Sequence, residues 1–270
     1  MADPTSFLQR HFALPGKAAL VTGASGGIGR AFAVALAQAG ALVGIHGRAK
    51  GRLEETRALI DGAGGRSVIL TAELGEVAAC KALIEEAHAA LGRLDILVNN
   101  AGMNRRKPLV EMTPDDFDVI MAANLRSALL LSQAAHPIMR EQGGGKIVHV
   151  GSITSTYGLG GVSVYGMSKS ALAHLTKTMA VEWAGDNIQV NCLAPGRIET
   201  ERVDELDRAL ATKQGKSFDE VRASSRSSIP MGRLGEPDEF GQVAAFLCSD
   251  AAKYMTGSTV FVDGGSVSCL

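Results

Sequence analysis

A tyrosine and a lysine stand four positions apart in SVYGMSKSALAHLTK, which covers residues 163–177. The apolar spacing of this stretch is typical of a helix, and positions i and i+4 of a helix share a face. Tyr165 and Lys169 can therefore point into the same space. A phenol beside an ammonium group can move a proton, although the same pair also occurs in ordinary surface packing.

The proton chemistry depends on the charge of the lysine. A free phenol with a pKa of about 10 is a poor partner for proton transfer at neutral pH. The positive charge of Lys169 favours the phenolate, so we expect it to lower the pKa of Tyr165. Other elements of the fold must bring a reacting group to this pair.

Apolar runs of strand length alternate with helical patterns along the chain. The runs are continuous rather than alternating in polarity, which indicates strands that are buried on both faces. Such a sheet needs helices on both sides. The sequence therefore predicts an α/β fold, a single Rossmann-like domain over residues 1–270 with a doubly wound parallel sheet of about seven strands. The expected strands are residues 18–23, 42–47, 67–72, 94–100, 146–152, 188–196 and 258–265.

One segment, at about residues 198–234, interrupts this alternation. It carries charged, glycine and serine residues between the sixth strand and the last helix. A connection of this length usually has a function. We expect a substrate lid with helices of its own.

Composition excludes several classes of protein. The 27 basic and 28 acidic residues give a net charge of −1 without a basic stripe, so we expect no nucleic-acid partner. The apolar stretches are too short to span a bilayer, and residues 1–17 lack the pattern of a secretory signal, so we expect a cytoplasmic protein without a membrane partner. Widely spaced cysteines argue against a metal site and indicate reduced, mostly buried thiols. They are Cys80, Cys192, Cys248 and Cys269.

The first expected strand ends in TGASGGIGRAF, residues 22–32. Gly23, Gly27 and Gly29 lie at the turn from strand to helix. There the backbone can approach a pyrophosphate closely, and the helix N-terminus offers unpaired N–H groups. This context, more than the glycine spacing alone, predicts a dinucleotide site.

The end of the second strand indicates which dinucleotide binds. A carboxylate there would accept hydrogen bonds from the ribose hydroxyls, whereas a 2′-phosphate needs a cation. The sequence has His46, Gly47 and Arg48 at this point, and Arg48 can fork onto a phosphate. The pattern favours NADP(H) and leaves NAD(H) possible, since Gly26 in the turn supplies no second cation.

Taken together, these motifs resemble the short-chain dehydrogenase/reductase family, and the match covers nearly the whole chain. It rests on TGASGGIG at 22–29, NNAG at 99–102, Asn124 in MAANL, Ser152, YGMSK at 165–169 and PG at 195–196. The loop MNRRKPL is similar to that of sugar-acid dehydrogenases such as gluconate 5-dehydrogenase. The overall frame is equally similar to 3-oxoacyl-acyl-carrier-protein reductases.

The resemblance implies roles for individual residues. Asn124, Ser152, Tyr165 and Lys169 would form the catalytic group, in which Tyr165 is the general acid/base, Ser152 holds the substrate oxygen and Asn124 supports the lysine through water. One departure is Glu73, where the family usually places an aspartate beside the adenine. The implied cofactor contacts are Gly23, Ser25, Gly27, Ile28, Gly29, Arg48, Glu73, Leu74, Asn100, Ala101, Gly102, Tyr165, Lys169, Pro195, Gly196 and Ile198.

The implied activity is the interconversion of a secondary alcohol and a ketone by hydride transfer with NADP(H). Arg105 or Arg106 could bind a carboxylate or phosphate of the substrate, or both could be solvated charges. The candidate substrates are a sugar acid or polyol and a 3-oxoacyl thioester. A sensor or scaffold that binds NADP(H) without turnover is the alternative. Apolar outer stripes on the helices at 114–139 and 165–183, with the resemblance, lead us to expect a homotetramer.

Overall fold

Seven parallel strands form the centre of the structure, a computed structural model that describes residues 4–267. The strand order is β3-β2-β1-β4-β5-β6-β7, which confirms the predicted doubly wound sheet. The strands are β1 (Ala18–Thr22), β2 (Leu42–His46), β3 (Arg66–Leu70), β4 (Ile96–Asn99), β5 (Gly145–Val150), β6 (Ile188–Pro195) and β7 (Thr259–Val262).

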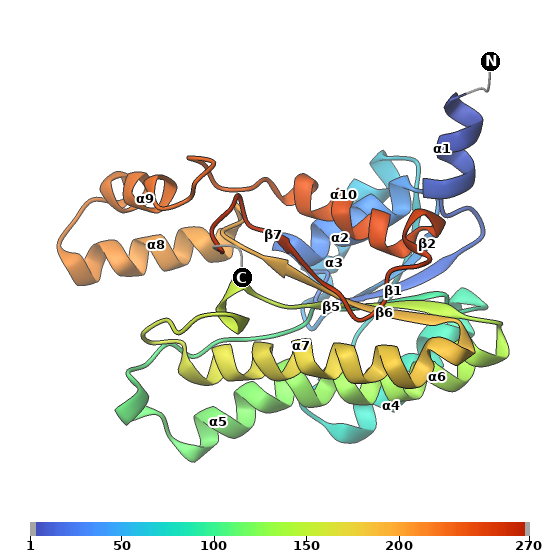
Figure 1. Ribbon diagram of the computed structural model, residues 1–270, viewed down its shortest axis with the longest axis horizontal. Helices are drawn as coiled ribbons and strands as arrows, with labels where there is room; N and C mark the ends of the chain where they lie inside the picture. Colours follow the sequence, from blue (N-terminus) through green and yellow to red (C-terminus); the bar gives the residue numbers. More distant parts are fainter. Residues whose placement is uncertain (1–3, 268–270) are drawn as a thin grey trace.

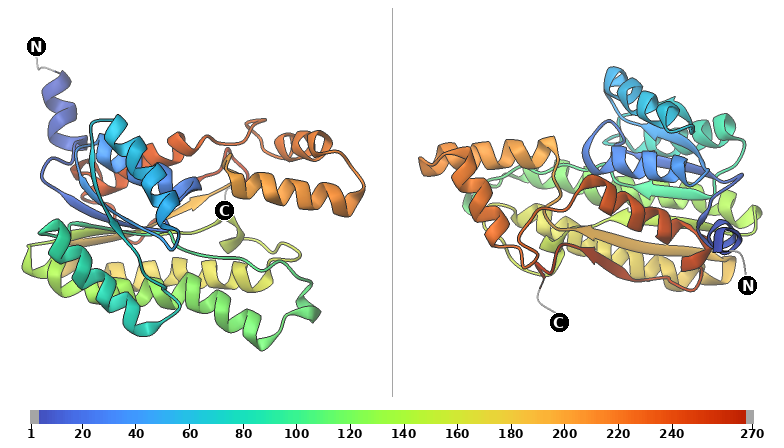
Figure 2. Two further views of the ribbon diagram at one scale, coloured as in Figure 1. Left: turned by 180° about the vertical axis from the view of Figure 1, so that it is seen from behind. Right: turned by 90° about the horizontal axis from the view of Figure 1, so that it is seen from above.

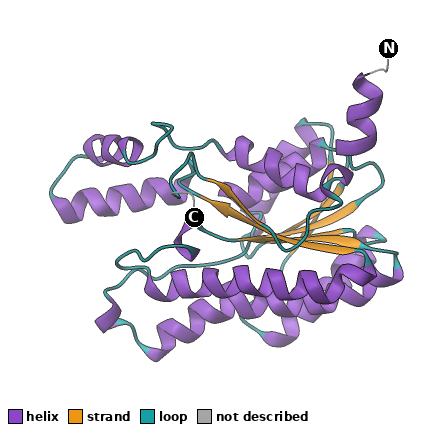
Figure 3. Ribbon diagram, in the orientation of Figure 1, coloured by secondary structure: helices purple, strands orange, loops and turns teal. Residues whose placement is uncertain are grey.

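Helices cover both faces of this sheet (Figures 1 and 3). Each face buries its own apolar cluster, as the continuous apolar strands require. One face carries α2 (Gly27–Gln38), α3 (Lys50–Gly62) and α10 (Pro237–Cys248). The opposite layer holds α4 (Val77–Leu91), α5 (Pro114–Met121), α6 (Ser127–Glu141) and α7 (Ser163–Trp183).

The strand order reverses between β1 and β4, which are neighbours although β2 and β3 intervene in the sequence. Ligands of open α/β sheets bind at the carboxyl ends of the strands beside such a reversal. The turn after β1 and the NNAG stretch after β4 meet there. Thr22 fixes this junction, since its Oγ1 donates to the Val98 carbonyl at 3.1 Å and accepts from the Asn100 amide at 3.0 Å.

The helix expected at residues 114–139 is interrupted by a wider turn, Ala122–Arg126, of π-helical type. Such turns insert one extra residue and often occur at functional sites. Here the turn directs Asn124 into the protein, where only 2% of its surface is exposed.

Two helices fill the segment predicted as a lid: α8 (Glu201–Gln214) and α9 (Phe218–Ser227). Both lie beyond the sheet in each view (Figures 1 and 2). Buried Asp207 of α8 pairs with Arg197, which follows β6, and with Arg222 of α9. This network joins the two helices to the end of β6. That the segment closes over a substrate remains a prediction.

The N-terminal segment forms a helix from Pro4 to Phe12 (α1), which the sequence analysis did not predict. The ring of Phe12 lies 6.3 Å from that of Phe246 in α10, and this contact anchors the helix. Cys80, Cys192 and Cys248 are buried free thiols, and Cys269 lies outside the described residues. Within residues 4–267, no helix combines the length and apolar character that a membrane crossing requires.

Candidate active site

Tyr165 and Lys169 lie one turn apart at the start of α7, as the sequence predicted. The Lys169 Nζ lies 5.7 Å from the centroid of the Tyr165 ring. It donates a hydrogen bond of 2.7 Å to the Val150 carbonyl at the end of β5. Lys169 is buried, so its position is fixed by the sheet as well as by the helix.

The pKa values correct one expectation. Burial lowers the pKa of Lys169 to about 8, and burial raises the pKa of Tyr165 above its ordinary value. Lys169 was expected to lower the pKa of Tyr165, but desolvation of the phenol dominates in the ligand-free site. The groups that oppose this effect are Ser152, by a hydrogen bond, and the guanidinium groups of Arg202 and Arg106.

Ser152 follows β5 and is almost fully buried. Its Oγ accepts hydrogen bonds from the Thr154 amide at 3.1 Å and from the Thr154 hydroxyl at 2.9 Å. With its acceptor capacity used, the Ser152 hydroxyl is oriented to donate its own proton. It shares a hydrogen bond with Tyr165 and can donate to an oxygen bound between them.

Asn124 supports the same region from the π-helical turn. Its Oδ1 accepts from the Met103 amide at 2.7 Å, and its Nδ2 donates to the Met103 carbonyl at 2.9 Å and to Ser168 Oγ at 3.0 Å. Ser168 in turn donates to the Tyr165 carbonyl at 2.7 Å. Asn124 therefore ties the loop after β4 to the first turn of α7. A water link to Lys169 remains a prediction.

The glycine turn after β1 has the shape that a dinucleotide needs. A Cβ on Gly29 would overlap the Gly23 carbonyl and the Asn100 side chain, so only glycine fits there. Gly23 has φ +68°, in the left-handed region that favours glycine. The turn leads directly into the N-terminus of α2, which has no side-chain cap within residues 4–267, so its first N–H groups can bind an anion. The residues present therefore fit a bound pyrophosphate.

The NNAG stretch after β4 forms the other wall of the groove. Asn100 Nδ2 donates to the Thr22 and Gly23 carbonyls at 2.8 and 3.1 Å, and the Ala101 amide donates to Thr22 Oγ1 at 3.1 Å. A Cβ on Gly102 would lie 2.9 Å from Asn124 Oδ1. These contacts set the width between the turn after β1 and the catalytic group.

The corner beyond the turn holds the residues expected around the adenosine. Arg48 follows β2, is exposed, and pairs with Glu73 at 3.5 Å. A Cβ on Gly47 would lie 3.3 Å from Ser25, so the ends of β1 and β2 adjoin. Leu74 is buried in the apolar cluster that includes α4, and Ile28 is partly buried against the cluster on the other face of the sheet.

The PG stretch closes the groove on the β6 side. Pro195 ends β6, and the Gly196 amide donates to the Val262 carbonyl of β7 at 3.0 Å. Ile198 is buried and pairs with Gly235 in an isolated bridge. The chain then enters α8 through Thr200, whose methyl group would lie 3.6 Å from a Cβ on Gly27.

The two candidate substrate arginines differ in their surroundings. Arg105 pairs with Asp115 at 2.8 Å and with buried Asp116 at 2.9 Å, so it stabilises the start of α5. Among the described residues, Arg106 has no hydrogen bond or ion pair. It is exposed at the rim of the site, and partial desolvation together with the charge of Arg197 lowers its pKa.

Arg106 is also close enough to Tyr165 to influence its pKa, as is Arg202 of α8. The rim of the catalytic group is therefore electropositive, and Arg106 is free to bind an anion. Sequence reasoning proposed Arg105 and Arg106 as equals. It could not separate them, because the difference depends on Asp116 in the next helix.

Sequence reasoning missed three residues of this region. Thr22 joins the ends of β1 and β4, Thr200 brings the start of α8 against the glycine turn, and Arg52 of α3 lies beside Gly26. Thr22 begins the glycine motif and could have been considered. The other two are separated from the turn by long stretches of sequence.

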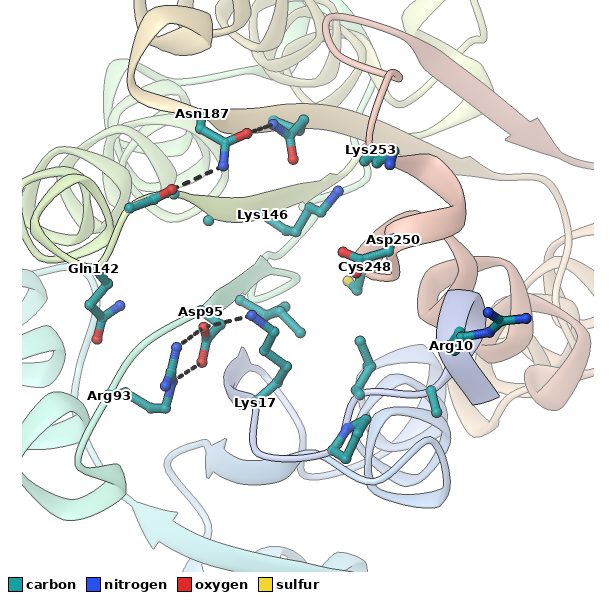
Figure 4. Close-up of a pocket in the computed structure, with 18 of the residues that line it drawn as sticks. Arg10, Lys17, Arg93, Asp95, Gln142, Lys146, Asn187, Cys248, Asp250 and Lys253 are labelled. Carbon is teal, nitrogen blue, oxygen red and sulfur yellow. Dashed lines mark hydrogen bonds and ion pairs between the residues drawn. The ribbon is translucent and has the colours of Figure 1, made fainter. Parts of the chain in front are cut away.

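A cavity of about 640 Å³ lies at the opposite edge of the sheet, among the amino ends of the strands (Figure 4). Its Asp95 binds Arg93 through two bonds of 2.6 Å and Lys17 at 3.3 Å. None of the predicted site residues line it. The candidate active site is therefore the groove at the carboxyl ends, not this cavity.

A Rossmann-like sheet, a glycine turn that fits a pyrophosphate and a Tyr–Lys–Ser–Asn group are typical of dinucleotide-dependent oxidoreductases. Comparison with known proteins agrees. A family model described as enoyl-(acyl carrier protein) reductase matches residues 23–267. A tropinone reductase homolog from Arabidopsis thaliana is 40% identical over 260 residues, which cover 95% of this chain and 94% of the relative.

Two solved structures are also similar to this chain over almost its whole length. A 3-oxoacyl-(acyl-carrier-protein) reductase from Agrobacterium tumefaciens C58 with NADP bound has a TM-score of 0.88 and 38% identity, covering 98% of this chain and 99% of that one. A gluconate 5-dehydrogenase from Burkholderia cenocepacia J2315 in complex with NADP and tartrate has a TM-score of 0.87 and 36% identity, covering 97% and 99%.

The chain therefore belongs to the short-chain dehydrogenase/reductase family, as its motifs predicted. It is an enzyme of the class that acts on CH–OH groups with NAD(P)+ as acceptor.

Proposed function

We propose that this protein is an NADP(H)-dependent oxidoreductase that interconverts a secondary alcohol and a ketone in a carboxylated polyol, a substrate of the sugar-acid class. The observation that carries the proposal is Arg106 at the rim of the site, close to Tyr165, whose guanidinium has no hydrogen bond or ion pair within residues 4–267. A carboxylate bound there places the rest of a short polyol toward the phenol.

NADP(H) is the cofactor in this proposal. Structural relatives at 36–38% identity were solved with NADP, and the groove of this chain fits a dinucleotide. Arg48 at the end of β2 is the expected ligand of the 2′-phosphate. The sixteen groove residues predicted from the sequence are the proposed cofactor contacts. When bound, the nicotinamide supplies or accepts the hydride.

The protein moves the proton in this reaction. Because burial raises the pKa of Tyr165, its phenol is protonated at neutral pH and can serve as the donor when a ketone is reduced. Ser152 donates a hydrogen bond to the substrate oxygen. Lys169 and Asn124 hold the first turn of α7 in place through Val150 and Ser168.

A 3-oxoacyl thioester is the second candidate substrate. Leu109 and Val110, next to the arginine loop, are 67% and 93% exposed and could contact an acyl chain. The similarity to a 3-oxoacyl-(acyl-carrier-protein) reductase supports this candidate. Arg106 favours the sugar acid, because an acyl chain does not need an isolated cation beside the phenol.

We further propose a homotetramer. Phe117 of α5 and Met167 of α7 are 44% and 49% exposed in the single chain, on the helices whose outer stripes were predicted to pair. Burying such side chains against a second copy is favourable.

A substrate panel tests the function. We expect oxidation of gluconate with NADP+ to exceed that of glucitol, which has the same carbon skeleton without the carboxylate, and reduction of acetoacetyl thioesters with NADPH to be slower than that of a keto acid. Tyr165→Phe should reduce turnover by at least about 100-fold while cofactor affinity, measured by calorimetry, stays unchanged. Faster turnover of the thioesters would favour the second substrate. Turnover of none of these compounds would favour a non-catalytic NADP(H) sensor.

A further inference from the structure

Gly26, in the turn after β1, has no side chain, and the guanidinium of Arg52 occupies the adjoining space. A Cβ on Gly26 would lie 2.9 Å from Arg52 Nη2 and 3.6 Å from its Cζ. Arg52 comes from the first turn of α3, four positions after Arg48 in the sequence. The cation that the turn itself lacks is therefore supplied from a helix.

Two contacts hold Arg52 against the turn. Its Nε donates to the Ser25 carbonyl at 3.2 Å, and its Nη2 forms an ion pair with Glu201. Glu201 is the first residue of α8, so this pair connects the turn to the segment predicted as a lid. Thr200, which caps α8, lies beside Gly27. The start of α8 is thus fastened over the glycine turn.

The neighbouring cation has a similar arrangement. Arg48 pairs with Glu73 at 3.5 Å, and both side chains are largely exposed. The corner between β2 and the glycine turn therefore holds these two arginine–carboxylate pairs, and a third pair, Arg30 with Glu55, lies beside Arg52. Their charges sum to zero when no ligand is bound.

We propose that Arg52 is a second ligand of the cofactor's 2′-phosphate, and that it binds this phosphate by giving up Glu201 and so releasing the first turn of α8. The inference rests on NADP(H) as the proposed cofactor. In this proposal Arg52 pairs with Glu201 when the cofactor is absent and with the 2′-phosphate when NADP(H) is bound.

Charge balance explains why the 2′-phosphate should replace the carboxylates that pair with the arginines, instead of binding beside them. A phosphate monoester carries about −1.5 to −2 charge at pH 7. Adding it to a neutral corner leaves that excess beside two carboxylates, which it repels. Withdrawal of Glu73 and Glu201 leaves two guanidinium groups to neutralise the phosphate, and guanidinium forks match its oxygen atoms.

NAD(H) has no 2′-phosphate, so the ion pair between Arg52 and Glu201 should persist when NAD(H) binds. The two cofactors should therefore differ in their effect on α8 as well as in affinity. The first turn of α8 is freed by NADP(H) and stays fastened with NAD(H).

Calorimetric titration of the full chain with each cofactor, without substrate, tests the binding part. Arg52→Ala should weaken NADPH binding by at least about tenfold and leave NADH binding within about twofold. Glu201→Gln should strengthen NADPH binding several-fold and leave NADH unchanged, because the competing carboxylate is gone. Arg57→Ala is the matched control, since Arg57 lies on the same helix and pairs with Glu54 there.

Hydrogen exchange tests the release. Backbone amides at the start of α8 should exchange faster with NADP+ than with NAD+, and Glu201→Gln should remove this difference. Equal losses for both cofactors in Arg52→Ala, or equal exchange of α8 with both, would overturn the inference. Neither measurement uses turnover, so an inactive substrate panel would count against the proposed function and not against this exchange.

Discussion

Replacing Arg106 with alanine should raise KM for a carboxylated substrate about tenfold and lower kcat little. Arg106 has no partner among the described residues, so its loss leaves no protein carboxylate unpaired. The substitution therefore removes one hydrogen bond between the substrate carboxylate and a charged group, which contributes about 1.5–3 kcal/mol to binding. Because solvent screens the exposed charge of Arg106, we expect a loss of binding free energy near the lower bound. A loss of about 1.4 kcal/mol weakens binding tenfold.

The same substitution should change the pH dependence. Arg106 is one of two guanidinium groups that oppose the effect of burial on the pKa of Tyr165. Without it the phenolate is less favourable, so the pKa rises further. In alcohol oxidation Tyr165 must accept a proton, and the rise of kcat/KM with pH should therefore shift to higher pH.

Arg105→Ala is the matched control from the neighbouring position. It removes ion pairs with Asp115 and Asp116 and leaves buried Asp116 with Lys107 as its remaining cation. We expect a lower Tm with an unchanged ratio of kcat/KM for gluconate over glucitol. The reasoning fails if Arg106→Ala slows both substrates equally, or if Arg105→Ala alone removes the preference for the carboxylate.

Three further predictions concern the cofactor, the turn and assembly. Arg48→Ala should weaken NADPH binding about tenfold or more and barely affect NADH, as measured by calorimetry; equal losses would contradict phosphate recognition. Gly29→Ala should lower the free energy of unfolding by about 1–3 kcal/mol in urea titration, since overlap with Gly23 and Asn100 exceeds the gain of about 1 kcal/mol in helix propensity. Phe117→Glu should split the proposed tetramer in light scattering, and a wild-type monomer at micromolar concentration would refute that assembly.

The fold could be predicted from local patterns because parallel strands buried on both faces need continuous apolar runs. All seven runs form strands, and the reversal between β1 and β4 follows from the right-handed connections of such sheets. The helix at α1 was missed, since its anchor is Phe246, which is distant in sequence. The π-helical turn at Asn124 was missed because it keeps the apolar pattern of a continuous helix.

The candidate site was predictable where spacing alone sets geometry, as for Tyr165 and Lys169 on one helix face. The direction of the Tyr165 pKa was not predictable, because burial depends on elements that the motif does not include. Arg52 was equally hidden. The Arg52 guanidinium occupies the space that a side chain at position 26 would fill. The sequence shows that Gly26 lacks a side chain, but it does not show that Arg52 lies there.

The first turn of α8 links the two halves of the site. Successive residues of a helix point about 100° apart, so Glu201 can face Arg52 at the cofactor corner while Arg202 influences Tyr165. In the proposed exchange, release of Glu201 by the 2′-phosphate also allows Arg202, which pairs with Glu205, to shift. If Arg202 withdraws, the pKa of Tyr165 rises, and if it closes on a bound carboxylate beside Arg106, substrate and cofactor are held by the same turn. The effect of Glu201→Gln on the pH profile, with NADP+ against NAD+, measures which movement occurs.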